Sequence, residues 1–321
     1  MQTSGTDRAA RRRAAWLLLA AAALWGVSFP TVKALYLVMA ARRPEADTVF
    51  MTGCALAPRF LLGGALLALW LGREAGRLTR REIEQGAVLA LFLGGGIFLQ
   101  NEGLHSTSAS VSAFLTQFYV ILIPLWLALL ARRRPRGRTM AAAVLVLAGV
   151  ALLGRFDLNE WRPGRGELLT LLSAIFFAGQ ILCLGAKRYA DNSPLKTAMI
   201  MLVATGLFFA GWLATRASGV ALVAESLSSP AWWTLTAVLT LFCTVGAFGL
   251  MNTFQPRVTP TQAGLIYCME PVFTALWSFF LPGLFSASWQ IHYNNEALSG
   301  ALLLGGGLTV AANVLEATGA E

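Results

Sequence analysis

The stretch "YCMEPVFTALW", from Tyr267 to Trp277, places a carboxylate, Glu270, directly before a proline, Pro271, within an apolar run. Burial without a partner favours the neutral, protonated form of a carboxylate. A group that exchanges its proton as water reaches it could couple proton movement to transport. Pro271 has no N–H to donate to the carbonyl of Tyr267, so the helix can bend here. Alternatively, Glu270 only hydrogen-bonds to a neighbouring helix.

Three further ionisable side chains fall within apolar runs, namely Lys33, Arg59 and Glu102. A charge at the centre of a membrane helix costs about 2.5–3.5 kcal/mol on insertion scales, so such residues usually have a function. All three are expected in the outer halves of their helices, where they could form an ion-pair network that closes the outer side. Lys33 and Arg59 could instead simply extend to the membrane interface.

Uncharged polar and aromatic residues extend this group into a candidate cavity. Such a cavity would suit an amphipathic metabolite, including apolar or aromatic amino acids, although any single aromatic ring could equally pack against lipid or another helix. The candidate substrate-binding residues are Trp25, Ser28, Gln117, Tyr119, Gln180, Asn252, Tyr267 and Trp277. The candidate coupling or gating residues are Glu270, Pro271, Pro124, Lys33, Arg59 and Glu102.

The composition indicates which elements position these side chains. Hydrophobic residues make up 56% of the 321 residues, charged residues only 13%, and the mean hydropathy is +0.63. A soluble protein rarely has so little polar surface. About 20 apolar residues in a helix cross a bilayer, whose interior also requires every backbone group to be hydrogen-bonded. We expect an all-α integral membrane protein with ten transmembrane helices, at residues 14–38, 52–71, 84–103, 108–131, 139–155, 166–186, 197–215, 231–253, 261–281 and 297–316.

Cysteine and histidine usage argues against several other classes of protein. The four cysteines occur singly, with no C-x-x-C pair, and the two histidines are far apart in the sequence. This pattern gives little support to a metal site or a disulfide framework, so no cofactor is expected. No convergent set such as Ser with His or Asp stands out, so an enzyme is not expected. Most of the +9 net charge lies in loops, which argues against a nucleic-acid partner.

Lysine and arginine predict the orientation of the chain. They concentrate in the N-terminal tail and in alternate loops, most densely in "RRRPRGR" from Arg132 to Arg138. Because such an excess marks the cytoplasmic side, both termini are expected to be cytoplasmic. The long first apolar run favours an uncleaved helix over a secretory signal. The expected location is the lipid bilayer of the cell inner membrane, as a multi-pass protein.

The two halves of the chain resemble each other. "FLTQFYVILIPLWLALL" in the fourth run parallels "GLIYCMEPVFTALWSFF" in the ninth, each with a proline followed by bulky apolar residues. Five spans per half would give the two copies opposite orientations, and inverted repeats of this kind are typical of secondary transporters. The expected division is a basic cytoplasmic tail (1–13), two inverted five-helix repeats (14–155 and 156–316) and a short C-terminal tail (317–321).

The sequence also resembles the drug/metabolite transporter superfamily, in its EamA-type branch of ten-helix carriers. The resemblance rests on "ALWGVSFPTVK" and "APRF" in the first two runs, on "NEGLHSTSASVSAFLTQFYVILIPLW" across the third and fourth, and on "VTPTQAGLIYCMEPVFTALW" in the ninth. It covers essentially the whole chain. It implies a carrier that moves a small metabolite, amino acid or drug, often outward, by alternating access between the two halves.

The chain departs from this family in two places. A glutamate that commonly precedes the last span of each half is missing from the first half, and an insertion at 282–296 displaces its counterpart, Glu296, in the second. This insertion either covers the outer mouth or is a tolerated loop. The glycine clusters Gly94–Gly96 and Gly305–Gly307 favour close helix packing. The fifth and tenth spans could therefore pack together or against a second copy in a homodimer.

The expected function is a secondary transporter that moves a small-molecule substrate, with export the expected direction and proton coupling an option. Within the superfamily, the alternative is an antiporter of nucleotide sugars or phosphorylated metabolites, which would call for more cavity cations than Lys33 and Arg59. Outside it, the alternatives are an intramembrane enzyme and a structural membrane protein. A water-accessible cavity that touches Gln117, Gln180 and Glu270 would distinguish transport from these.

Overall fold

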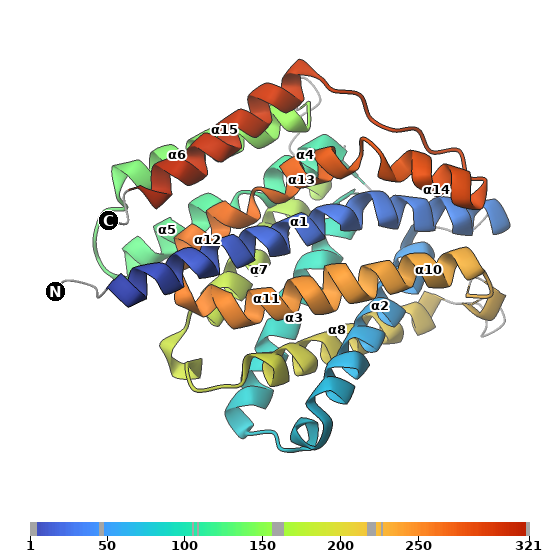
Figure 1. Ribbon diagram of the computed structural model, residues 1–321, viewed down its shortest axis with the longest axis horizontal. Coiled ribbons are helices and arrows are strands. Elements are labelled where there is room, and N and C mark those ends of the chain that lie inside the picture. The colour runs from blue at the N-terminus through green and yellow to red at the C-terminus, as the bar shows by residue number, and fades with distance from the viewer. Residues whose placement is uncertain are drawn as a thin grey trace.

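The computed structural model describes residues 5–44, 48–104, 106–107, 109–155, 164–216, 223–225 and 227–318, and regular structure in this part is entirely helical (Figure 1). The first half contains α1 (Gly5–Arg42), α2 (Thr48–Leu71), η1 (Gly72–Gly76), α3 (Arg80–Leu104), α4 (Ala109–Thr116), α5 (Tyr119–Leu130) and α6 (Gly137–Leu153). The second half contains α7 (Arg165–Leu184), η2 (Lys187–Tyr189), α8 (Pro194–Arg216), α10 (Pro230–Val238), η3 (Leu239–Gly246), α11 (Ala247–Phe254), η4 (Gln255–Arg257), α12 (Pro260–Tyr267), α13 (Glu270–Trp277), α14 (Leu281–Trp289) and α15 (Gly300–Ala317).

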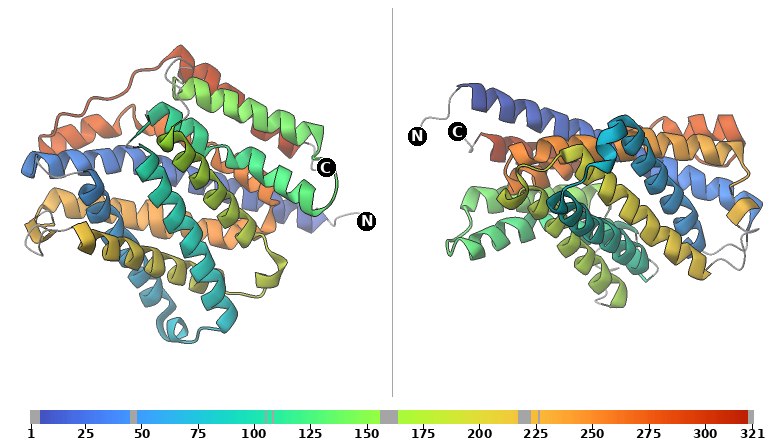
Figure 2. Two further views of the ribbon diagram at one scale, coloured as in Figure 1. Left: turned by 180° about the vertical axis from the view of Figure 1, so that it is seen from behind. Right: turned by 90° about the horizontal axis from the view of Figure 1, so that it is seen from below.

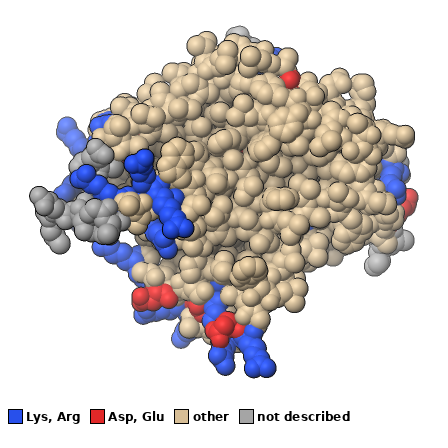
Figure 3. Space-filling model, viewed as in Figure 1, with Lys and Arg blue, Asp and Glu red and all other residues tan. Residues whose placement is uncertain are grey.

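The helices confirm a membrane protein but not the number of ten spans. Among the described residues, eight helices are long and apolar enough to cross a membrane, and one further pair, Pro260–Trp277 with Leu281–Trp289, is bent by 52°. α6 has 17 residues and is shorter than these spans. Lys and Arg gather near the end that holds both termini and at the lower corner formed by η1 and the start of α3, and a broad uncharged surface separates them from the opposite end (Figures 1 and 3).

Equivalent helices of the two halves pack against each other, first in the pair α2 and α8. A Cβ atom added to Gly53 would lie 3.0 Å from Leu213 Cδ1, whereas one added to Gly63 would lie 3.4 Å from Leu202 Cδ1. Residues later in α2 therefore contact residues earlier in α8, so the two helices are antiparallel.

The last helices of the two halves, α6 and α15, form the second such pair. Arg138 Nε donates to Leu315 O at 2.6 Å near the start of α6, and Gly149 faces Gly305 near its end. A Cβ atom on Gly149 would lie only 2.6 Å from Gly305 O and 2.5 Å from Thr309 Oγ1, so only glycine permits this approach. The fifth and tenth expected spans therefore pack with each other. Antiparallel pairing of equivalent helices is the arrangement that an inverted repeat requires.

The glycine cluster of α3 makes room for aromatic side chains of α7. Added Cβ atoms would lie 2.5 Å from a ring atom of Phe176 at Gly95 and 2.8 Å from one of Phe177 at Gly96. Close packing replaces the hydrophobic driving force that lipid does not supply between helices. The expected role of this cluster in helix packing is confirmed.

Three spans are interrupted close to their middles. Residues 117–118 separate α4 from α5, and residues 268–269 separate α12 from α13. Between α10 and α11, the chain forms the π-helical segment η3 over residues 239–246. Transporters commonly place their substrate sites at such breaks, because the freed backbone groups can bind ligands there.

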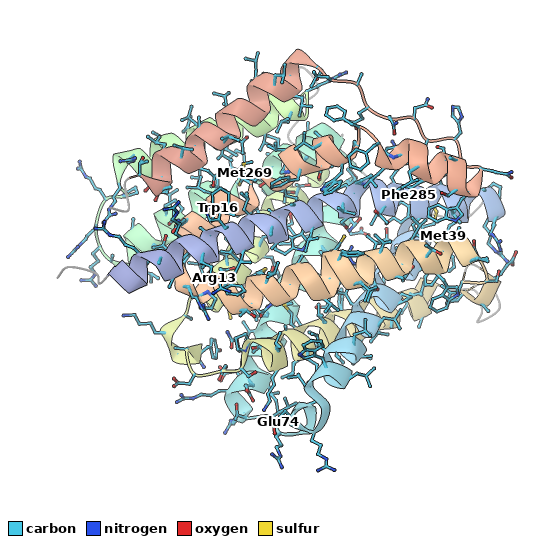
Figure 4. All side chains as sticks on the ribbon, in the orientation of Figure 1. Arg13, Trp16, Met39, Glu74, Met269 and Phe285 are labelled. Carbon is cyan, nitrogen blue, oxygen red and sulfur yellow. The ribbon has the colours of Figure 1, made fainter. Side chains whose placement is uncertain are left out.

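Two segments outside the expected spans, the basic N-terminal tail and the insertion, contain helical structure. α1 begins at Gly5, so the described part of the basic tail continues the first helix. Within the insertion, α14 is followed by an extended segment that returns to α15, and the left view of Figure 2 shows this segment at the edge of the bundle. Phe285 of α14 packs in one apolar cluster with Met39 of α1, at the end of α1 opposite the N-terminus (Figure 4). The insertion is thus packed against the bundle, and covering the outer mouth remains a prediction.

Candidate functional site

The interrupted spans α4–α5 and α12–α13 meet at their breaks. Gln117 is the first residue after α4 and Cys268 the first after α12, so they hold equivalent positions in the two halves. Cys268 Sγ donates a hydrogen bond to Gln117 Oε1 at 3.1 Å and lies 3.5 Å from Tyr119 Oη. All three side chains are buried. Because these equivalent residues contact each other, they lie near the approximate two-fold axis that relates the two halves.

The two prolines of these spans have different positions relative to the breaks. Pro271 lies in the first turn of α13, where a helix needs no N–H donor, directly after the break. The interruption beside Glu270 that Pro271 predicts is therefore present. Pro124 lies buried inside α5, beyond the break of its own span. The break at Gln117 is not at a proline.

Aromatic rings form one side of the region next to this break. The ring centroid of Trp25 in α1 lies 5.2 Å from those of Tyr267 and Phe248. Tyr267 Oη donates to Gln255 Oε1 at 2.9 Å, and Gln255 Nε2 donates to Ile181 O at 2.7 Å. This chain of contacts connects α1, α11, α12 and α7 around one cluster.

Two buried polar atoms beside this aromatic cluster have no hydrogen-bond partner. They are Trp25 Nε1, a donor, and Asn252 Oδ1, an acceptor. Asn252 Nδ2 donates to Phe248 O at 2.9 Å, so both unpartnered atoms belong to side chains that contact Phe248. An unsatisfied buried polar atom destabilises a protein by about 1–3 kcal/mol, and functional sites are one place where it is retained.

Glu270 is the first residue of α13 and remains partly exposed inside the bundle. Within the described chain, its carboxylate forms neither a hydrogen bond nor an ion pair, so the bond to a neighbouring helix that would give it a purely structural role is not found. Its charge nevertheless interacts with Arg59, and with Tyr119 and Cys268 next to the break. Glu270 therefore lies between the break and Arg59.

Arg59 of α2 is only 7% exposed and points into the bundle. Its guanidinium donates to Thr244 Oγ1 at 2.6 Å, to Ser28 Oγ at 3.1 Å and to the Cys243 carbonyl at 3.3 Å. Thr244 and Cys243 belong to the π-helical segment η3, whose widened turn presents them to α2. Arg59 thus does not extend to the membrane interface.

The expected outer network of Lys33, Arg59 and Glu102 is not assembled. Lys33 is exposed and its Nζ lies 4.8 Å from the ring centroid of Tyr293 in the insertion. Glu102 is partly exposed at the end of α3, and among the described residues it forms no ion pair with either cation. His105, three residues after Glu102, lies outside the described residues.

Two other candidates are bonded to neighbouring helices. Gln180 Nε2 contacts Met201 Sδ of α8 at 3.7 Å, and Trp277 Nε1 donates to Ala23 O of α1 at 2.9 Å. Trp277 therefore joins α13 to α1 rather than offering its N–H to a cavity. No group of three possible metal-ligating side chains occurs in the described part of the chain.

Sequence reasoning missed the contact of Gln117 with Cys268, the π-helical segment and the inward direction of Arg59. The sequence repeat does not reveal the first, because it sets Gln117 opposite Tyr267, one residue before Cys268. No local pattern marks the π-helical segment in the apolar run "LTLFCTVG". The side of α2 on which Arg59 lies depends on tertiary packing.

The geometry defines a class of protein: a helical membrane protein with antiparallel repeats and interrupted spans that meet at a polar centre. The model of the EamA-like transporter family matches residues 12–155 and 164–309, one copy for each half. The chain therefore belongs to the EamA-like transporter family, and it is a transporter of the drug/metabolite type. One similar solved structure, a crystal structure, superposes with a TM-score of 0.72 and 19% identity over 96% of this chain and 97% of that one, which shows a shared fold. No curated protein sequence matches the chain.

Proposed function

We propose that this protein exports a small organic molecule across the cell inner membrane by alternating access, with Glu270 binding and releasing the coupling proton. In this proposal both termini are cytoplasmic, and the interrupted spans at Gln117 and Cys268 allow the two halves to rearrange around the centre. Trp25, Phe248 and Tyr267 would contact the apolar part of the substrate.

The proposal rests on the surroundings of Glu270 in the structure. Glu270 is partly exposed within the bundle and adjoins a helix break, and its carboxylate has no hydrogen-bonding partner among the described residues. A carboxylate fixed by partners would stay in one protonation state, whereas this one can respond to the water that reaches it. Glu270 lies in the first turn of α13, where the partial positive charge of a helix N-terminus interacts favourably with an ionised carboxylate.

The test is transport by the purified protein in liposomes. Uptake of a panel of labelled metabolites and amino acids would be compared with and without an imposed pH gradient, for the wild type, Glu270→Gln and Glu102→Gln. We expect the gradient to stimulate flux of at least one compound, and the stimulation to disappear in Glu270→Gln alone. Glu102→Gln is the matched control, since it neutralises a carboxylate at the end of α3.

Gradient-independent flux of equal size in wild type and Glu270→Gln would show a facilitator and remove the coupling role of Glu270. Flux in the direction opposite to export, with Glu270 still required, would correct the direction alone. Absence of flux for every compound would contradict the transport proposal itself.

A further inference from the structure

Arg59 is a buried cation without an anionic partner. No carboxylate lies within ion-pair distance of it in the described chain, although Glu270 interacts with its charge at longer range. Its three hydrogen-bond acceptors are the Thr244 and Ser28 hydroxyls and the Cys243 carbonyl, all of them neutral. An unneutralised charge inside a membrane protein is unfavourable unless a ligand or a water-filled cavity compensates for it.

The three bonds orient the guanidinium and leave part of it unused. A guanidinium has five N–H donors in a fixed planar fork, and the three observed bonds occupy one donor on each nitrogen. One N–H on each terminal nitrogen therefore remains. Thr244 is itself fixed, since its Oγ1 donates to Leu239 O at 3.0 Å within η3. The fork is thus held in place by helices α1 and η3 before any ligand arrives, which lowers the entropy lost on binding.

A second unused donor lies on the same face of α1. Trp25 is one helical turn before Ser28, so the two side chains lie on one side of the helix. Ser28 binds Arg59, and Trp25 Nε1 is buried without a partner. The ring of Trp25 also borders the aromatic cluster with Phe248 and Tyr267. Donors for an anion and a surface for an apolar group are therefore adjacent.

We propose that Arg59, with Ser28 and the indole N–H of Trp25, binds the carboxylate of the transported molecule, whose apolar body packs on the rings of Trp25, Phe248 and Tyr267. This inference rests on the proposed transport function and names its substrate class. An arginine can pair with a planar carboxylate through two parallel hydrogen bonds. A phosphate dianion would need further cations, and the other cation considered, Lys33, is exposed and lies on Tyr293. The single negative charge of one carboxylate would neutralise the single positive charge of Arg59.

The test compares two probes that differ only in this group, 3-phenylpropionate and its neutral amide, 3-phenylpropanamide. Binding to the full-length protein in detergent would be measured by titration calorimetry, for wild type, Arg59→Gln and Arg59→Lys. Hydrogen bonds to a charged group contribute about 1.5–3 kcal/mol, so we expect the wild type to prefer the acid by about ten- to a hundredfold. Arg59→Gln should bind both probes equally, and Arg59→Lys should retain an intermediate preference, because it keeps the charge but loses the fork.

Trp25→Phe gives a second test that removes the indole N–H, keeps an aromatic ring at this position and does not alter Arg59. It should weaken binding of the acid several-fold more than binding of the amide, because both probes lose the same ring contact but only the acid loses a hydrogen bond to its charged group. Trp232→Phe is the matched control, since Trp232 Nε1 is another buried indole N–H without a partner, in the separate cluster around Met39. This control should change neither affinity.

The proposal is overturned if the wild type binds neither acid nor amide, if it shows no preference, or if Arg59→Gln or Arg59→Lys folds and keeps the full wild-type preference. Should Arg59→Gln fail to fold, the Arg59→Lys and Trp25→Phe results decide. Transport of the same probes in liposomes separates the two proposals. Preferential binding of the acid without flux would contradict transport only, and flux without a preference for the acid would contradict the carboxylate site only.

Discussion

Cys268 and Gln117, which hold equivalent positions in the two halves, hydrogen-bond to each other at 3.1 Å across the breaks of α12–α13 and α4–α5. Each residue thus belongs to the interruption of its own span and also stabilises the interruption of the other. The centre of the protein is defined by this contact rather than by either half alone.

A double-mutant cycle should detect this contact. Gln117→Ala and Cys268→Ala together should destabilise the protein by less than the sum of the single changes, with a coupling free energy of about 0.5–1 kcal/mol, because the first removal already abolishes the shared bond. Thermal unfolding in detergent measures it. Gln117→Ala combined with Cys54→Ala, a buried thiol in another apolar cluster, should be additive. Additivity in both pairs would mean that the Cys268–Gln117 bond contributes nothing.

The crossing of α6 and α15 should tolerate no side chain at Gly149. Gly149→Ala places a methyl group 2.5–2.6 Å from Thr309 Oγ1 and Gly305 O, so the helices must separate, and we expect a loss of about 1–3 kcal/mol in the free energy of unfolding. Gly307→Ala is the control, because nothing lies within 4 Å of its added Cβ. That variant should be neutral or slightly more stable. Equal melting temperatures for the two variants would refute the tight crossing.

The hydroxyl of Thr244 should matter more than an equally buried threonine hydroxyl elsewhere. Thr244→Val removes the acceptor of Arg59 Nε while keeping the shape of the side chain, and we expect a destabilisation of about 1.5–3 kcal/mol. Thr205→Val is the matched control, since Thr205 Oγ1 is buried without a partner. Removing an unsatisfied hydroxyl should be neutral or stabilising. If Thr205→Val were the more harmful change, Arg59 would not depend on η3 for its orientation.

Tyr293 in the insertion predicts a dependence of stability on alkaline pH. Burial, together with the charge of Glu296, raises the pKa of Tyr293 from its ordinary value of 10.0 to about 12. The unfolded chain therefore ionises first, so stability is unaffected below pH 10 and falls as the pH rises from 10 toward 12. The difference in unfolding free energy between wild type and Tyr293→Phe isolates this effect from other titrations. A difference that stays constant across this range would place Tyr293 in water.

The sequence predicted those features that depend on local composition or spacing. Apolar runs located the helices, and Pro271 located the break beside Glu270, because a missing N–H acts within one turn. The fourth span breaks at Gln117 rather than at Pro124, and the partner of Gln117 is a cysteine of the other half, so this break could not be located from the proline. Which side chains lie opposite each other across helices is not encoded in spacing along one helix.

Arg59 is the clearest case of that limit. A charge in an apolar run raises the free energy of the protein in the membrane. Either an extended side chain that reaches the interface or an ion pair with another charge could offset this cost. The structure has neither, because the π-helical segment of a span almost two hundred residues further along the chain supplies neutral acceptors at the right depth. Lys33, by contrast, is exposed, as an interfacial side chain would be, although it contacts Tyr293.

The π-helical segment η3 also sets the rotational phase of the rest of its span. Each residue of an α-helix advances the chain by about 100°, and a π-helical stretch holds more residues per turn. Deleting one residue from 239–246 would let the segment return to an α-helix with α11 and η4 near their present orientation. Rewinding the same eight residues as an α-helix would instead rotate α11 and η4 by about 100° relative to α10. Gln255 would then turn away from both Tyr267 Oη and Ile181 O, which it now joins. The π-helical turns of η3 therefore determine which side chains in the rest of the span face α7 and α12.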